Sequence, residues 1–145
     1  MDQRKTLTKE LEGIIMGENE IAKLREKAKD PTVLNYLDNI LKTVQKNKDL
    51  IVKEIEGLNT EVPQDEGLFG KIVEFFNSFK EKNIDSDKDI LREAIKGTEM
   101  GFKAILDLII EDNKVHEHLK KDLIEVSKEY TTHIKNMEEY LLSLK

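Results

Sequence analysis

The sequence predicts an all-α fold, a four-helix bundle in which a long crossover joins two antiparallel hairpins. Apolar residues recur three and four positions apart through four long segments, the spacing of amphipathic helices. Charged residues make up 37% of the chain and aromatic residues only 6%, which is typical of helical proteins with Lys- and Glu-rich surfaces. A long stretch, residues 59–85, separates the second predicted helix from the third. The length fits a single domain, residues 1–145.

The first hairpin consists of predicted helices over residues 5–29 and 31–58. Asp30 and Pro31 favour a helix start at their junction, because Asp is a good N-cap and Pro is tolerated in the first turn. So short a junction makes the two helices antiparallel neighbours. The predicted stripes are Leu7, Leu11, Ile14, Glu18, Ile21, Leu24 and Ala28, and then Leu34, Leu37, Leu41, Val44, Lys48, Ile51, Ile55 and Leu58.

The crossover is expected to contain a short amphipathic helix over residues 68–82. Most of the chain's Phe residues lie in it, at Phe69, Phe75, Phe76 and Phe79. One interpretation is that these side chains attach the crossover to the bundle. The other is that they form an exposed aromatic surface for a partner protein or a second subunit.

The second hairpin consists of predicted helices over residues 87–111 and 115–144. Ser86, followed three positions later by Asp89, resembles a capping box in which Asp replaces the usual Glu or Gln. The sequence Asp-Asn at 112–113 favours a brief turn between the two helices. The predicted stripes are Leu91, Ala94, Thr98, Phe102, Ile105 and Ile109, and then Leu119, Leu123, Val126, Tyr130, His133, Met137, Tyr140 and Leu144.

Two pairs of glycines lie inside predicted helices. Gly13 and Gly17 are four positions apart in the first helix, and Gly97 and Gly101 are four positions apart in the third. A Gly inside a helix costs up to ~1 kcal/mol relative to Ala, so the pairs require a compensating reason. We expect that reason to be a close approach between the first and third helices.

Composition and charge narrow the classes of function. The net charge is −6, whereas nucleic-acid binding requires a basic surface, so we expect no nucleic-acid partner. The absence of Cys removes disulfides, thiolate metal sites and Cys nucleophiles, and it fits a cytoplasmic location. The first residues are charged rather than signal-like, and no apolar run reaches the ~20 residues of a membrane span. We therefore expect a cytoplasmic protein with no membrane partner.

Residues from Leu7 to Leu144 resemble a bacterial ferritin-like four-helix-bundle family whose role is unassigned. The order and spacing of several short motifs together carry the resemblance. It implies a ferritin-like fold with one crossover, but it implies no activity. The matching residues are Asp30 and Pro31 at the first junction, Leu58, Asn59 and Pro63 after the second helix, Gly70, Phe76, Phe79 and Lys80 in the connector, Ile90, Leu91, Glu93, Gly97 and Glu99 in the third helix, and His133 in the fourth.

The chain also departs from this family. Met16 and Ile21 stand where the family carries Asp and Tyr in its first helix. Val73 and Glu74 replace a His-Arg pair in the connector, and Phe76 replaces a Trp. The resemblance therefore implies no role that depends on those side chains.

The centre of the predicted bundle is a polar layer of Glu18, Lys48, Thr98, Tyr130 and His133. A carboxylate-bridged di-metal centre takes Glu from two helices and Glu-x-x-His from the other two, and this layer lacks most of those ligands. Lys48 cannot bind a metal while protonated, and its charge repels a cation. We therefore expect no metal, cofactor or catalytic residue, and we interpret the layer as an ion-pair and hydrogen-bond network that fixes helix register.

Three functional hypotheses follow. The leading one is a non-catalytic binding or structural protein that forms a homo-oligomer, most simply a dimer. A stress-related or regulatory adaptor would instead use the Phe-rich crossover, and a metal-binding protein or oxidase would hold iron or manganese. Two further His residues near the last turn are expected to be exposed and to point in different directions. The candidate metal ligands are Glu18, Glu99, Glu129 and His133, and the exposed pair is His116 and His118.

Overall fold

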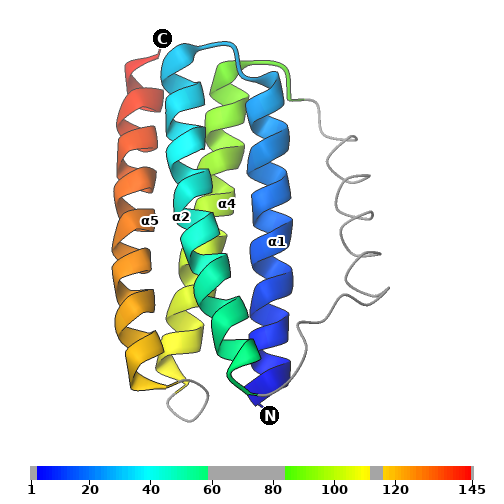
Figure 1. Ribbon diagram of the computed structural model, residues 1–145. Helices are drawn as coiled ribbons and strands as arrows, with labels where there is room; N and C mark the ends of the chain where they lie inside the picture. The colour runs from blue at the N-terminus through cyan, green and yellow to red at the C-terminus, as the bar shows by residue number, and fades with distance from the viewer. Residues whose placement is uncertain (1–2, 59–83, 112–115, 145) are drawn as a thin grey trace.

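The computed structural model describes residues 3–58, 84–111 and 116–144 of the chain. These residues form a bundle of four long helices that lie side by side (Figure 1). The prediction of an all-α four-helix bundle is thereby confirmed. The helices are α1 (Gln3–Lys27), α2 (Pro31–Glu56), α4 (Asp87–Ile110) and α5 (Glu117–Ser143).

Several sequence predictions fall outside the described residues. They include the crossover helix over 68–82 and the turn at 112–113. The proposed partner surface, Phe69, Phe75, Phe76 and Phe79, lies outside them as well. Within the described ranges, no helix combines the length and hydropathy that crossing a bilayer requires.

The helices occupy the four corners of the bundle. Both α1 and α5 pack against α2 and α4, whereas α1 and α5 do not contact each other. These two helices therefore lie on one diagonal of the bundle, and α2 and α4 lie on the other. Neighbouring helices are antiparallel, so α2 and α4 run in the same direction (Figure 1).

Two predicted helix starts are confirmed by their caps. The Asp30 carboxylate accepts a hydrogen bond from the Thr32 amide at 2.9 Å, and Pro31 occupies the first turn of α2. The Ser86 hydroxyl accepts a hydrogen bond from the Asp89 amide at 3.1 Å at the start of α4. These side chains satisfy amides that have no partner inside the helix.

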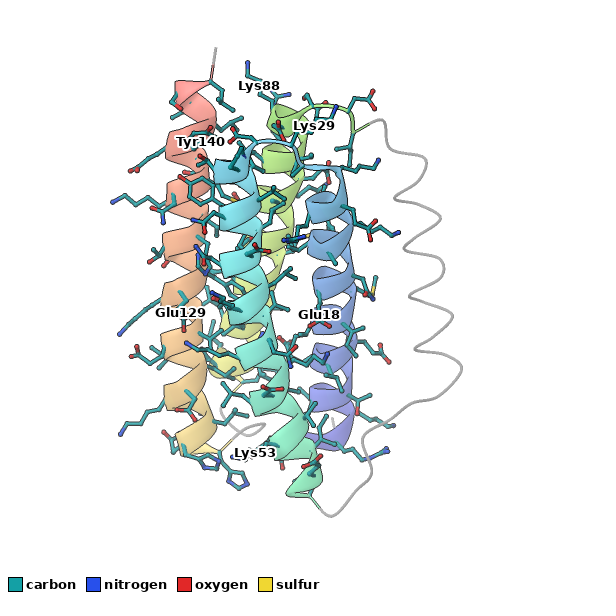
Figure 2. The ribbon with its side chains drawn as sticks, turned by 45° about the horizontal axis from the view of Figure 1, so that its top comes forward. Glu18, Lys29, Lys53, Lys88, Glu129 and Tyr140 are labelled. Carbon is teal, nitrogen blue, oxygen red and sulfur yellow. The ribbon has the colours of Figure 1, made fainter. Side chains whose placement is uncertain are left out.

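The junction between α1 and α2 also binds the rest of the bundle. The amide of Lys29 donates to Asp87 Oδ1 at 3.1 Å, which joins the junction to the start of α4. The hydroxyl of Tyr140 donates to Asp30 Oδ2, which joins it to the end of α5. Figure 2 shows Lys29 and Tyr140 at this same end of the molecule. Polar contacts at this end of the bundle therefore join the α1–α2 junction to the start of α4 and to the end of α5.

The core fills the space between the helices with Leu, Ile and Val side chains. Its buried face on α1 follows the predicted stripe, from Leu7 to Leu24. On α2 the predicted stripe is displaced by one residue at alternate turns. Val33, Ile40 and Asn47 are buried, and the neighbouring residues at 34, 41 and 48 are only half-buried. Because α2 contacts helices on three sides, both residues of the first two pairs are apolar.

The expected close approach at the glycine pairs is wrong for α1. A Cβ atom added at Gly13 or Gly17 would meet none of the described atoms within 4 Å. On α4, a Cβ at Gly97 would lie 3.2 Å from Glu20 Oε2, and one at Gly101 would lie 3.7 Å from the Tyr130 ring. Among the described residues, Gly97 and Gly101 therefore face side chains, and Gly13 and Gly17 face no neighbouring atom, rather than another helix backbone.

Candidate functional site: the polar centre of the bundle

Glu18 and Lys48 meet in an ion pair between α1 and α2. Lys48 Nζ donates to Glu18 Oε1 at 3.0 Å. The two side chains are 24% and 30% exposed, so the pair lies at the edge of the core rather than on the open surface. At this degree of burial, each charge depends on the other to offset lost hydration.

His133 lies in a second polar cluster, between α2 and α5. Its Nε2 is 2.8 Å from the hydroxyl oxygen of Thr43, which also donates to Glu129 Oε1 at 3.2 Å. Lys46 Nζ donates to Glu129 Oε2 at 2.9 Å. Burial lowers the pKa of His133, and the Glu129 carboxylate opposes this effect. The cluster therefore contains a carboxylate neutralised by Lys46 and an imidazole that burial keeps in its neutral form near pH 7.

Tyr130 and Asn47 form a third group, which is the most deeply buried. Tyr130 is 3% exposed and Asn47 is 1% exposed. Burial raises the pKa of Tyr130 to about 12, and a side-chain hydrogen bond with Asn47 acts in the opposite direction. Thr98, on α4, is also buried, but its hydroxyl donates to the backbone oxygen of Ala94 at 2.7 Å within its own helix. Thr98 therefore makes its hydrogen bond without any of the other polar residues.

The residues predicted for the central layer are thus distributed among different interfaces. Glu18 projects from α1 and Glu129 from α5, the two helices that do not touch (Figure 2). Glu99 is exposed on α4. Across the described ranges, no group of three or more His, Asp or Glu side chains is arranged to hold a metal ion.

His116 and His118 do not point in different directions. Their rings stack with centroids 5.5 Å apart and planes inclined by 15°. Nε2 of His116 lies 3.6 Å from Glu54 Oε1, and Nε2 of His118 lies 3.4 Å from Glu54 Oε2. Both rings are exposed, as expected, at 63% and 72%. His116 is the N-cap residue of α5, outside the regular helix, so the helical spacing that predicted divergence does not apply.

Three buried polar residues of α2 were not among the predicted site residues, namely Thr43, Asn47 and Glu54. All three lie on the buried face of α2, from which the predicted stripe is displaced by one residue at alternate turns. Their spacing of four and seven, in register with Ile40 and Ile51, was the available signal. Thr43 is the residue that brings His133 and Glu129 together, so the error in the stripe concealed the centre of one polar cluster.

Comparison of the chain with protein-family models, with curated proteins and with solved structures gave no match.

Proposed function

We propose that this chain is a non-catalytic helical-bundle protein with a binding or structural role. In this proposal, ion pairs and hydrogen bonds occupy the part of the bundle where ferritin-like proteins hold their metal centre. The observation that carries the proposal is the 3.0 Å contact between Lys48 Nζ and Glu18 Oε1. An ammonium group neutralises the carboxylate that a divalent cation would otherwise need, and its charge repels such a cation.

The second polar cluster supports the same proposal. Both oxygens of Glu129 already accept hydrogen bonds, from Thr43 and from Lys46. The Nε2 atom of His133 is engaged by Thr43. To bind a metal, these two residues would have to give up three contacts that now balance their charge and polarity.

A ferritin-like connectivity and self-association also belong to the proposal. The parallel direction of α2 and α4 favours the connectivity with one long crossover that ferritin-like folds have (Figure 1). Self-association as a dimer is supported by large apolar side chains that are exposed on α4 and α5, because such residues mark interaction sites when they gather on one surface. Among the described residues they are Met100, Leu106, Ile110, Ile124 and Leu142, of which Leu106 and Ile110, four positions apart, share one face of α4. A cytoplasmic location completes the proposal, and it rests on the lack of Cys.

The alternative function is the binding of iron or manganese, and a direct measurement of bound metal distinguishes it from the proposed function. Purified protein is incubated anaerobically with Fe(II) or Mn(II), desalted, and analysed for bound metal. We expect no retained metal in the wild-type protein or in His133→Ala. His118→Ala, which alters an exposed imidazole on the same helix, is the matched control. Near-stoichiometric metal that is lost in His133→Ala but kept in His118→Ala would overturn the proposal and favour the metal-binding alternative.

Self-association is tested by the mass of the protein in solution. The double variant Leu106→Lys and Ile110→Lys places two charges on the exposed face of α4 without altering the buried core. We expect a wild-type dimer that becomes a monomer in this variant, measured by analytical ultracentrifugation. A monomeric wild-type protein would remove this part of the proposal.

A further inference from the structure

A cavity of about 740 Å³ lies between α1 and α4 and reaches inward to Asn47 and Tyr130, the most deeply buried of the polar groups described above. Its walls include Gly13 and Gly17 from α1 and Gly97 and Gly101 from α4. At the two α1 glycines an added Cβ would meet none of the described atoms within 4 Å, so these positions leave space along the wall. Met100 lines the cavity and is 63% exposed, so the cavity reaches the surface.

The deep end of the cavity contains a hydrogen-bond acceptor without a partner. Asn47, which is 1% exposed, lines the cavity beside Tyr130. Its Oδ1 atom is buried and accepts no hydrogen bond from any described residue. Buried polar atoms in folded proteins are nearly always paired, so an unpaired acceptor at a cavity wall indicates a missing donor.

Acidic side chains dominate the charged part of the wall. Glu10 on α1 and Asp107 and Glu111 on α4 line the cavity, together with the exposed Lys9. Burial and, to a smaller extent, the nearby Asp107 carboxylate raise the pKa of Glu10 to about 7. Neither cause is a positive charge, so no cation among the described residues offsets the burial of this half-buried carboxylate.

We propose that this cavity binds a small, mostly apolar molecule that carries a protonated amine. The volume is in the range of natural small-molecule sites, which are mostly apolar and contain a few fixed polar groups. Ile14, Ile21 and Leu108 supply apolar walls for the body of the ligand. The ammonium group would supply the hydrogen-bond donor that the Asn47 oxygen lacks. It would also supply the positive charge that the Glu10 carboxylate lacks.

Each polar group of the wall has a separate part in this recognition. Glu10 pairs with the ammonium group, and Asp107 adds a second negative charge from the facing helix. Tyr130, whose hydroxyl stays protonated because burial raises its pKa to about 12, closes the deep end against water. An anionic ligand would be repelled by the same carboxylates, and a neutral ligand would leave Glu10 without a charged partner.

The inference rests on the proposed role as a binding protein, and binding assays test it directly. n-Decylamine, n-decanol and n-decanoate serve as probes of equal chain length and different head group, with affinities measured by isothermal titration calorimetry. We expect the amine to bind at least about tenfold more tightly than the alcohol, and the carboxylate to bind least, because an ion pair of ordinary strength is worth about that factor. Glu10→Gln should remove the preference for the amine, whereas Glu99→Gln, an exposed acid on α4, should preserve it.

Filling the cavity is the second arm of the experiment. Gly13→Leu places a side chain in the open space, and Lys5→Leu, at an exposed position of the same helix, is its control. We expect Gly13→Leu to abolish binding of decylamine and to raise the melting temperature, and Lys5→Leu to leave binding unchanged.

Four results would overturn the inference. Equal affinity for the three probes, or an unchanged preference in Glu10→Gln, would show that no cation site exists. A lower melting temperature in Gly13→Leu, with no probe bound by the wild-type protein, would show that another part of the chain fills the space. A change of mass in solution caused by Gly13→Leu would assign the cavity to a contact between copies. None of these results bears on metal retention at His133, so failure here is distinguishable from failure of the non-metal proposal.

Discussion

Replacing Glu10 by Gln should stabilise the protein at neutral and alkaline pH. The carboxylate lies on the wall of the α1/α4 cavity, where burial and the Asp107 charge raise its pKa from 4.5 to about 7. Between these two pH values the folded chain holds a proton that the unfolded chain has released. The folded state therefore binds more protons, and the free energy of unfolding falls as the pH rises through this window.

The magnitude follows from the same pKa values. Each pKa unit corresponds to about 1.4 kcal/mol, so a rise from 4.5 to about 7 destabilises the ionised folded state by about 3 kcal/mol. Glu10 is only half-buried, and solvent screening reduces this value, so the expected gain in Glu10→Gln is about 1–3 kcal/mol above pH ~7. In a domain of this size the melting temperature should rise by roughly 3–9 °C.

Urea unfolding followed by circular dichroism, at a series of pH values from about 4 to 8, measures this effect. The difference between Glu10→Gln and wild type should be near zero below pH ~4.5, should grow between pH ~4.5 and ~7, and should then stay constant. Glu99→Gln, which removes an exposed carboxylate from α4, should show no such pH-dependent difference. If the Glu10→Gln difference is the same at every pH, or is destabilising above pH ~7, the reasoning from burial is refuted.

Three further predictions concern the polar contacts. Glu129→Gln should lower the pKa of His133 still further, because that carboxylate raises it against the effect of burial, and NMR titration of the imidazole measures the change. An unchanged or higher pKa would contradict the assignment. Asp30→Ala should lower the melting temperature by removing the N-cap of α2, whereas Asp30→Asn keeps a capping oxygen and should retain most of the stability. Combining Lys48→Met with Glu18→Gln should change the free energy of unfolding by less than about 1 kcal/mol. Lys48→Met alone should cost more, because it leaves the half-buried Glu18 carboxylate without a charged partner. A double-mutant cycle that shows no coupling would contradict this prediction.

The helices and their starts were predictable because they depend on local chemistry. The four stripes of apolar residues and the caps at Asp30 and Ser86 act within a few residues of themselves. A capping side chain satisfies a nearby amide whatever the rest of the chain does. The direction of the first hairpin follows from the same information, because Asp30-Pro31 leaves no length for any other connection.

The candidate sites were less predictable because they depend on how helices rotate and separate. Lys48 was placed at the centre of the core face of α2, whereas the buried polar residue is its neighbour Asn47. A rotation of the helix by part of a turn exchanges these two residues, and each has apolar neighbours at the right spacing. Glycine spacing likewise indicates a place where side chains are missing. It does not predict whether a neighbouring helix backbone approaches that place or a cavity remains there. Only the distance between α1 and α4 distinguishes the two, and that distance depends on the packing of all four helices.

The α1/α4 cavity brings together features that each oppose stability. Gly13 inside α1 weakens the helix relative to Ala, the ionised Glu10 is poorly hydrated, and the Asn47 oxygen has no described partner. Elsewhere in the described core, Leu and Ile pack on one another and the buried Ser127 hydroxyl donates to a backbone oxygen, and the Thr8 hydroxyl is the one other buried side-chain atom without a described partner. Departures from ordinary packing and hydrogen bonding that gather at one place are the pattern of a functional site, because neutral drift would scatter them over the bundle. Gly13→Ala combined with Glu10→Gln should therefore give a more stable protein that no longer prefers decylamine. A double variant that is less stable than wild type would show that these residues serve the fold instead.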